Sequence, residues 1–114
     1  MALAAVALAG CNERAKTEVH TGGDPGRGSL LVDEEACGSC HVIPDKAQGN
    51  GLVGPPLAGI ARRAVIAGLL PNTPDNMTRW LQSPQSVVPG NAMPNMGLTQ
   101  QQARDITAYL YTLD

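Results

Sequence analysis

The five residues from Cys37 to His41 have the sequence Cys-Gly-Ser-Cys-His. A Cys-x-x-Cys-His pattern indicates attachment of a c-type haem. In that chemistry each cysteine sulfur adds to one vinyl group of the porphyrin, and the two-residue gap matches the distance between the vinyls. The adjacent His41 would then lie under the iron as an axial ligand. We therefore expect Cys37 and Cys40 to hold one haem c covalently and His41 to bind its iron.

Three other interpretations of this motif stay open from the five residues alone. A thioredoxin-like redox pair would need a βαβ pattern nearby, and the sequence contains none. A zinc site needs further ligands, but the only other histidine, His20, lies in a polar segment. A structural disulfide would be strained at this spacing. We therefore favour haem attachment.

The composition suits a small domain built around such a group. The chain has 114 residues, which is enough for one domain and too few for two. Hydrophobic residues make up 43%, but aromatic residues only 3%, and Phe is absent. Large rings normally supply much of the buried area of a core, so we expect the flat, apolar porphyrin to fill this one. The formal net charge of −2 argues against the basic surface typical of a nucleic-acid-binding protein.

The N-terminal segment, residues 1–10, resembles the signal of a bacterial lipoprotein. Residues 2–10 are uncharged and apolar, too short for the ~20 residues of a membrane-spanning helix but suited to an export signal. Leu8 to Cys11 have the sequence Leu-Ala-Gly-Cys and resemble a lipobox, although no Lys or Arg precedes the apolar run. The resemblance implies a lipid on Cys11 and a location at the periplasmic face of the cell membrane. A soluble periplasmic protein, whose apolar N-terminal helix ends in Gly-Cys, is the alternative.

Residues 11–27 are polar and rich in Gly and charge, which predicts a flexible tether. From residue 28 to residue 114 the pattern predicts one helical, loop-rich domain. A short amphipathic helix leads from Gly28 into the haem motif, residues 42–59 form a loop, and residues 60–70 include a short helix. Thr73 and Pro74 begin a further helix that ends at Ser83. A loop over 84–98 and a final helix behind a Thr99–Gln102 capping box complete the chain, and no strand pattern is visible.

An electron-carrying haem needs a second axial ligand, and methionine sulfur raises the potential relative to a second histidine. Of the four methionines, Met1 lies in the signal and Met77 lies on the apolar face of the 73–83 helix. Met93 and Met96 both lie in the 84–98 loop. The residues alone leave the choice between these two open.

From Gly28 to Leu113 the sequence resembles the class I, mitochondrial-type c cytochromes. That family has Cys-x-x-Cys-His, then Gly-Pro-x-Leu, then Pro-Gly-x-x-Met before a C-terminal helix. The corresponding stretches begin at Cys37, Gly54 and Pro89, and the last one ends at Met93. The resemblance implies an all-α cytochrome c fold of about four to five short helices, with long loops wrapped around one covalently bound haem.

The same resemblance assigns roles to further residues. It implies that Met93 is the second iron ligand and that Met96 packs at the pocket edge. The Pro55 carbonyl would accept a hydrogen bond from His41, Arg63 would lie near a haem propionate, and Trp80 would line the Met side of the pocket. The segment around Tyr109 would cross the N-terminal helix near Gly28.

Within the family, residues 70–74 and 93–98 are most similar to the cytochrome c domain of subunit II of bacterial haem–copper oxidases. The chain lacks the Cys pair and His of a dinuclear copper centre, so we expect a free-standing relative of that domain. The resemblance implies a monomeric, membrane-tethered carrier of single electrons in a respiratory chain, with redox proteins, such as a terminal oxidase, as partners. The alternative is a haem enzyme or a gas or redox sensor with an open sixth iron position.

Overall fold

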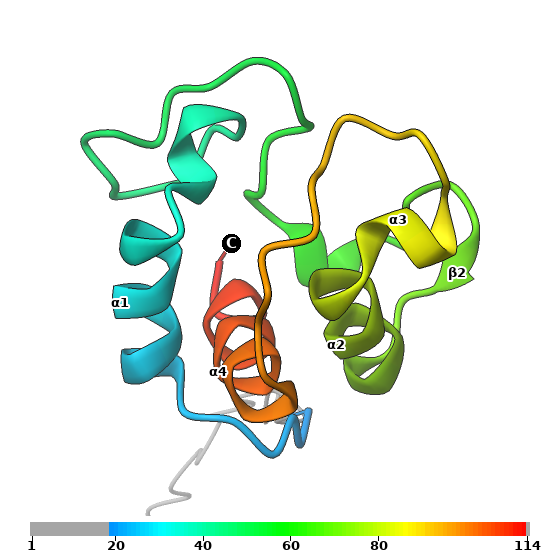
Figure 1. Ribbon diagram of the computed structural model, residues 1–114. Helices are drawn as coiled ribbons and strands as arrows, with labels where there is room; N and C mark the ends of the chain where they lie inside the picture. Colours follow the sequence, from blue (N-terminus) through cyan, green and yellow to red (C-terminus); the bar gives the residue numbers. More distant parts are fainter. Residues whose placement is uncertain (1–18, 114) are drawn as a thin grey trace, which may run out of the picture.

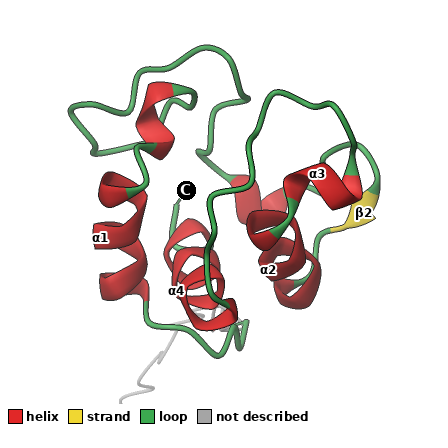
Figure 2. Cartoon of the chain, viewed as in Figure 1, coloured by secondary structure: helices red, strands yellow, loops and turns green. Residues whose placement is uncertain are grey.

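The structure, a computed structural model, describes residues 19–113 (Figure 1). The described part is mainly helical, as expected, and long loops join the helices (Figure 2). The signal segment, Cys11 and most of the expected tether lie outside the described residues. The elements are α1 (Pro25–Glu34), a 3₁₀ turn (Cys37–Ser39), a second 3₁₀ turn (Ile60–Arg62), β1 (Val65–Ile66), β2 (Leu70–Pro71), α2 (Pro74–Gln82), α3 (Pro84–Val87) and α4 (Gln100–Leu110).

Helix α1 begins at Pro25, three residues before the expected start at Gly28. The Asp24 side chain caps it by accepting a hydrogen bond from the Arg27 backbone N–H at 2.8 Å. An acidic cap followed by Pro at the first helical position is a strong helix start. Residues 25–27, which we expected in the flexible tether, are therefore helical.

Two further elements differ from the sequence expectation. Val65–Ile66 and Leu70–Pro71 form an antiparallel pair, although no strand was expected. The turn between them holds Ala67 and Gly68 at φ values of 53° and 69°, and strands of two residues are too short to show an alternating pattern. The expected 84–98 loop also starts with the short helix α3.

The expected starts of the two later helices are confirmed. Thr73 caps α2 by accepting a hydrogen bond from the Asn76 N–H at 3.2 Å. Thr99 and Gln102 form the reciprocal capping box at the start of α4. Both signals are local, so they act without help from distant parts of the chain.

Helices α1 and α4 lie side by side (Figure 1). Their backbones meet at Gly28, where a Cβ atom would fall 1.9 Å from the Asp105 carbonyl oxygen and 2.8 Å from the Tyr109 Cβ. Only glycine allows this approach, because every other residue carries the Cβ. The close crossing of the two helices therefore depends on Gly28.

A buried carboxylate joins the same two helices. Asp105, 3% exposed on α4, accepts hydrogen bonds from the Asp24 N–H at 2.8 Å, Arg27 Nε at 3.1 Å and Gln101 Nε2 at 3.0 Å. Burial alone would raise the pKa of this carboxyl group, but the hydrogen bonds from Asp24, Arg27 and Gln101 outweigh it and lower the pKa. The ionised carboxylate thus stabilises the contact between α1 and α4.

We expect Asp105→Asn to lower the free energy of unfolding at pH 7 by about 1–3 kcal/mol, because an amide cannot accept all three bonds. A lowered folded-state pKa means that the stabilisation is complete above the unfolded-state value of about 3.9. It is lost as the pH falls through the folded-state pKa. Urea unfolding of the haem-loaded protein at pH 7 and near pH 3 measures this.

The matched control is Asp75→Asn, because Asp75 is exposed on α2. We expect its effect to stay within about 0.5 kcal/mol at both pH values. An Asp105→Asn penalty that remains unchanged at the lower pH would contradict the ionised-carboxylate account.

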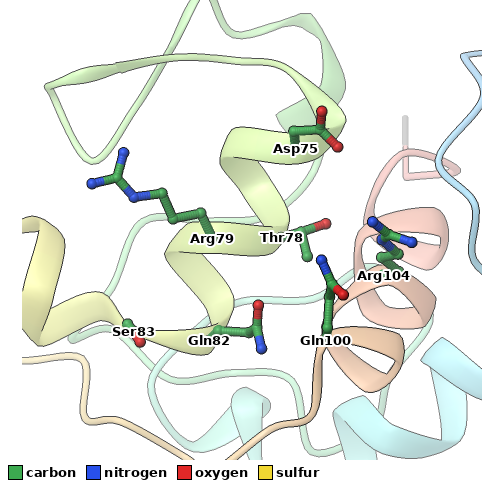
Figure 3. Close-up of a pocket in the computed structure, with 7 residues that line it drawn as sticks. All are labelled: Asp75, Thr78, Arg79, Gln82, Ser83, Gln100 and Arg104. Atoms are coloured by element: carbon green, nitrogen blue, oxygen red, sulfur yellow. The ribbon is translucent and has the colours of Figure 1, made fainter.

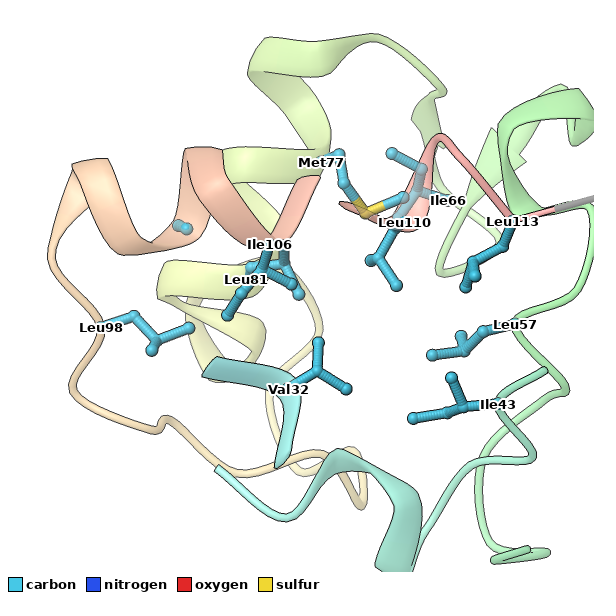
Figure 4. Packing of buried hydrophobic residues seen from close by; sticks show 11 residues of the cluster. Val32, Ile43, Leu57, Ile66, Met77, Leu81, Leu98, Ile106, Leu110 and Leu113 are labelled. Atoms are coloured by element: carbon cyan, nitrogen blue, oxygen red, sulfur yellow. The ribbon is translucent and has the colours of Figure 1, made fainter. Parts of the chain in front are cut away.

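Buried hydrophobic side chains from α1, α2, α4 and the connecting loops pack into one hydrophobic core (Figure 4). Val32 from α1, Ile106 from α4 and Met77 from α2 are each 1% exposed. Ile43 and Leu57, in the loop after the haem motif, point toward the same interior (Figure 4). No helix within residues 19–113 is both long enough and apolar enough to cross a membrane.

Candidate haem site

One apolar cavity brings most of the sequence-predicted site residues together. Cys37, His41, Pro55, Arg63, Trp80 and Met93 all line it, whereas Cys40 is not in the lining. Met96 does not line the cavity and packs against the buried cluster instead. The remaining lining residues are Val32, Leu57, Ile60, Val65, Ile66, Ala67, Met77, Leu81, Asn91, Ala92, Ile106 and Leu110.

Backbone groups of Gly54 and Pro55 fix the position of the His41 imidazole. Its Nδ1 lies 2.7 Å from the Pro55 carbonyl oxygen. A carbonyl only accepts, so Nδ1 carries the proton and Nε2 keeps its lone pair for a metal. A Cβ at Gly54 would fall 2.3 Å from His41 Cε1, so the backbone at Gly54 forms a close wall behind the ring.

The Cys-x-x-Cys-His segment is a tight turn enclosed by its own downstream loop. The backbone N–H groups of Cys40 and His41 both donate to the Cys37 carbonyl, at 3.2 and 3.0 Å. Gly51 donates to the Gly38 carbonyl at 3.0 Å, and a Cβ at Gly51 would come within 2.4 Å of the Cys40 nitrogen. The two cysteines and the histidine are therefore fixed relative to one another by backbone contacts.

The two thiols are free of disulfide bonding, and Cys37 is half-buried. Burial, and then the charge of Glu35, raises the pKa of the Cys37 thiol. Reactive redox cysteines have a lowered pKa, because their thiolate is stabilised. Cys37 therefore lacks the electrostatic environment of a thioredoxin-like redox thiol.

Asn72 fixes the segment of residues 60–63, which lies beside the cavity. The sequence analysis did not single out this residue. Asn72 Nδ2 donates to the carbonyls of Ile60 and Arg63, each at 2.8 Å, and its Oδ1 accepts from the Tyr111 hydroxyl at 2.6 Å. Burial raises the pKa of Tyr111 to about 12, so its hydroxyl stays a donor at neutral pH. The Arg63 guanidinium donates to the Pro56 carbonyl.

A second anchor that the sequence analysis missed is Lys46. Its ammonium donates to the Ser29 hydroxyl at 2.8 Å and to Asp33 Oδ2 at 2.9 Å. It also lies 5.3 Å above the Tyr109 ring, within cation–π range. Lys46 thus joins the loop after the haem motif to both α1 and α4.

A separate polar pocket lies between α2 and α4 (Figure 3). None of the sequence-predicted site residues lines it. It is lined by Asp75, Thr78, Arg79, Gln82, Ser83, Gln100 and Arg104. In Figure 3 the Arg79 side chain points away from Arg104, so the two guanidinium groups do not converge on one point.

The donor atoms around the apolar cavity fit a haem. An imidazole with a free Nε2 and a methionine thioether line the same cavity, and its other walls are largely aliphatic. His and Met are the axial ligands of electron-transfer c haems. The family model for "Cytochrome c" matches residues 26–114.

The chain belongs to the cytochrome c family. It therefore has the cytochrome c fold and carries one covalently attached haem c. The family and the relatives described below support a haem electron carrier. This membership sets aside the zinc and thioredoxin-like interpretations of the Cys-x-x-Cys-His motif.

The chain is similar to a cytochrome c2 and to two oxidase subunits. It is 35% identical over 104 residues to "Cytochrome c2" of Rhodopila globiformis, which covers 80% of this chain and 94% of that protein. It is 33% identical over 89 residues to "Cytochrome c oxidase subunit 2" of Alkalihalophilus pseudofirmus, and 35% over 86 residues to that of Bacillus sp. (strain PS3). These matches cover 76% and 72% of this chain but only 25% and 24% of the oxidase subunits, so this cytochrome c spans about a quarter of their length.

Proposed function

We propose that this cytochrome c transfers single electrons as a membrane-tethered monomer, with Cys37 and Cys40 as thioether attachments and with His41 and Met93 as permanent iron ligands. The observation that carries the proposal is the shared cavity, which His41 and Met93 line from segments 52 residues apart in the chain. Two fixed ligands favour electron transfer over catalysis, because no coordination position is open to a substrate.

The bound haem supplies a one-electron Fe(II)/Fe(III) couple, and the protein's residues tune and shield it. The His41–Pro55 hydrogen bond orients the imidazole and makes its Nε2 a stronger donor to the iron. The Met93 thioether is a soft donor that favours the reduced state. The aliphatic walls keep water out, Trp80 packs at the cavity, and Arg63 is placed to pair with a carboxylate such as a propionate.

The proposal also includes a lipid on Cys11 and a haem–copper oxidase as electron acceptor, at the periplasmic face of the cell membrane. The lipobox-like sequence Leu-Ala-Gly-Cys at residues 8–11 supports the lipid. The likeness to two proteins named cytochrome c oxidase subunit 2 supports the oxidase. Residues 12–24 would link the anchor to α1.

We expect Cys11→Ser to move the protein from the membrane fraction to the soluble fraction of an exporting bacterial host. Without the thiol, no acyl glyceride can be attached. Fractionation followed by haem staining measures the distribution.

The reduced wild-type protein, mixed with membranes that contain a haem–copper oxidase, should be reoxidised by O₂ in a cyanide-sensitive reaction.

The matched control is Asn12→Ser, which changes the next residue and keeps the thiol; it should stay in the membrane fraction. Unchanged membrane association of Cys11→Ser would overturn the lipid anchor. Reoxidation that cyanide does not inhibit would overturn the proposal that the oxidase is the acceptor. It would not contradict the proposed electron-carrier function.

A further inference from the structure

The segment that carries Met93 has almost no backbone hydrogen bonding of its own. Within residues 89–98, all of which the structure describes, the one backbone–backbone bond outside helices runs from the Asn91 N–H to the Val88 carbonyl, at 3.2 Å. Segments with so little internal bonding open easily. Some other contact must hold Met93 at the cavity.

Two side-chain amides make that contact. The Met93 backbone N–H donates to Asn91 Oδ1 at 2.7 Å, and the Met93 carbonyl accepts from Gln85 Nε2 at 2.8 Å. Both polar backbone groups of the residue are therefore bound by side chains, one on each side of its Cα.

The two amides are themselves tied to each other and to helix α3. Gln85 Nε2 also donates to the Asn91 carbonyl at 2.8 Å, and Gln85 Oε1 accepts from the Gly90 N–H at 2.9 Å. Asn91 Nδ2 donates to the carbonyls of Val88 and Pro84, at 2.6 and 3.1 Å. Pro84, the first residue of α3, is fully buried, so the network ends on a packed element.

We propose that Gln85 and Asn91 are positioning residues that keep the Met93 sulfur on the iron. This inference rests on the proposed role of Met93 as ligand. The amides limit the fraction of molecules in which the segment swings away and the sixth iron position opens. Gln85 does not line the haem cavity, whereas Asn91 does. In this account each of them acts through the backbone of Met93.

Imidazole measures that open fraction in the ferric, haem-loaded protein, because it binds iron only when Met93 has left. Its apparent dissociation constant equals the intrinsic constant divided by the open fraction, and Met93→Ala supplies the intrinsic constant. Gln85→Ala removes three hydrogen bonds, so we expect the apparent constant to fall on the order of tenfold or more. The weak red absorption band of Met–Fe(III) should disappear at correspondingly lower imidazole.

The matched control is Gln101→Ala, which removes a glutamine near the start of α4 that donates two hydrogen bonds, to Gly22 and Asp105, and none to the Met93 segment. It should lower stability without changing the imidazole constant. Gln85→Glu keeps the acceptor for Gly90 but loses both donors, so it should also tighten imidazole binding. If Gln85→Ala fails to fold, Gln85→Glu provides the same test.

The outcomes distinguish the proposed ligand role of Met93 from the proposed positioning role of Gln85 and Asn91. If Gln85 variants bind imidazole like the wild type while Met93→Ala binds it more tightly, the positioning role is overturned and Met93 remains the ligand. If Met93→Ala keeps the red band, the ligand assignment itself fails. If Gln101→Ala tightens binding as much as Gln85→Ala, general destabilisation explains the effect and the positioning role is again overturned.

Discussion

Met93→Ala should remove the red Met–Fe(III) band and lower the reduction potential on the order of 0.1 V, a fraction of the roughly 0.8 V range that axial ligands set. The thioether stabilises Fe(II) relative to Fe(III), so its loss favours the oxidised protein. Alanine also leaves the sixth iron position open to small ligands. Potentiometric titration followed by visible spectroscopy measures the shift.

Met96→Ala is the matched control, because Met96 lies three residues along the same segment and outside the cavity lining. We expect its red band to persist and its potential to stay near the wild-type value. A variant of Met96 that loses the band, alongside a variant of Met93 that keeps it, would reverse the ligand assignment.

Gly28→Ala should destabilise the protein by about 3 kcal/mol, the upper range for overpacking a close contact. The added Cβ would lie 1.9 Å from the Asp105 carbonyl oxygen, and this atom belongs to the backbone of α4, so no rotamer change relieves the clash. The two helices must separate. Urea unfolding of the haem-loaded protein, followed by the haem absorption and by circular dichroism, measures the loss.

Gly26→Ala provides the comparison on the same helix. A Cβ there meets only the Asp24 carboxylate, at 3.2 Å. Replacing glycine by alanine within a helix gains up to about 1 kcal/mol in propensity, so its net effect should stay within about 1 kcal/mol. Equal destabilisation by both variants would contradict a specific close approach at Gly28.

Local signals predicted the parts of the fold that form by local contacts. Thr73 and Thr99 each cap a helix whose N–H groups are only three residues away, so the sequence alone located both starts. The Asp24–Pro25 pair carries the same kind of signal. It was missed because the polar, Gly-rich composition around it favoured a tether.

Contacts between distant residues left no such signal. Asp105 binds the Asp24 N–H across 81 residues of chain, and the sequence around Asp105 is that of an ordinary amphipathic helix. Gln85 and Asn91 similarly look like loop residues until the structure brings them to Met93. The haem motif is recognisable because its spacing follows porphyrin chemistry, whereas these polar anchors depend on the packing of this particular chain.

The most direct test of the account is the visible spectrum of the oxidised and the reduced protein, matured in an exporting host. The account predicts c-type haem bands on reduction, together with the weak red band of a Met–Fe(III) bond in the oxidised protein. Haem bands without that red band would contradict His41/Met93 ligation, and would point instead to a haem with an open or different sixth ligand.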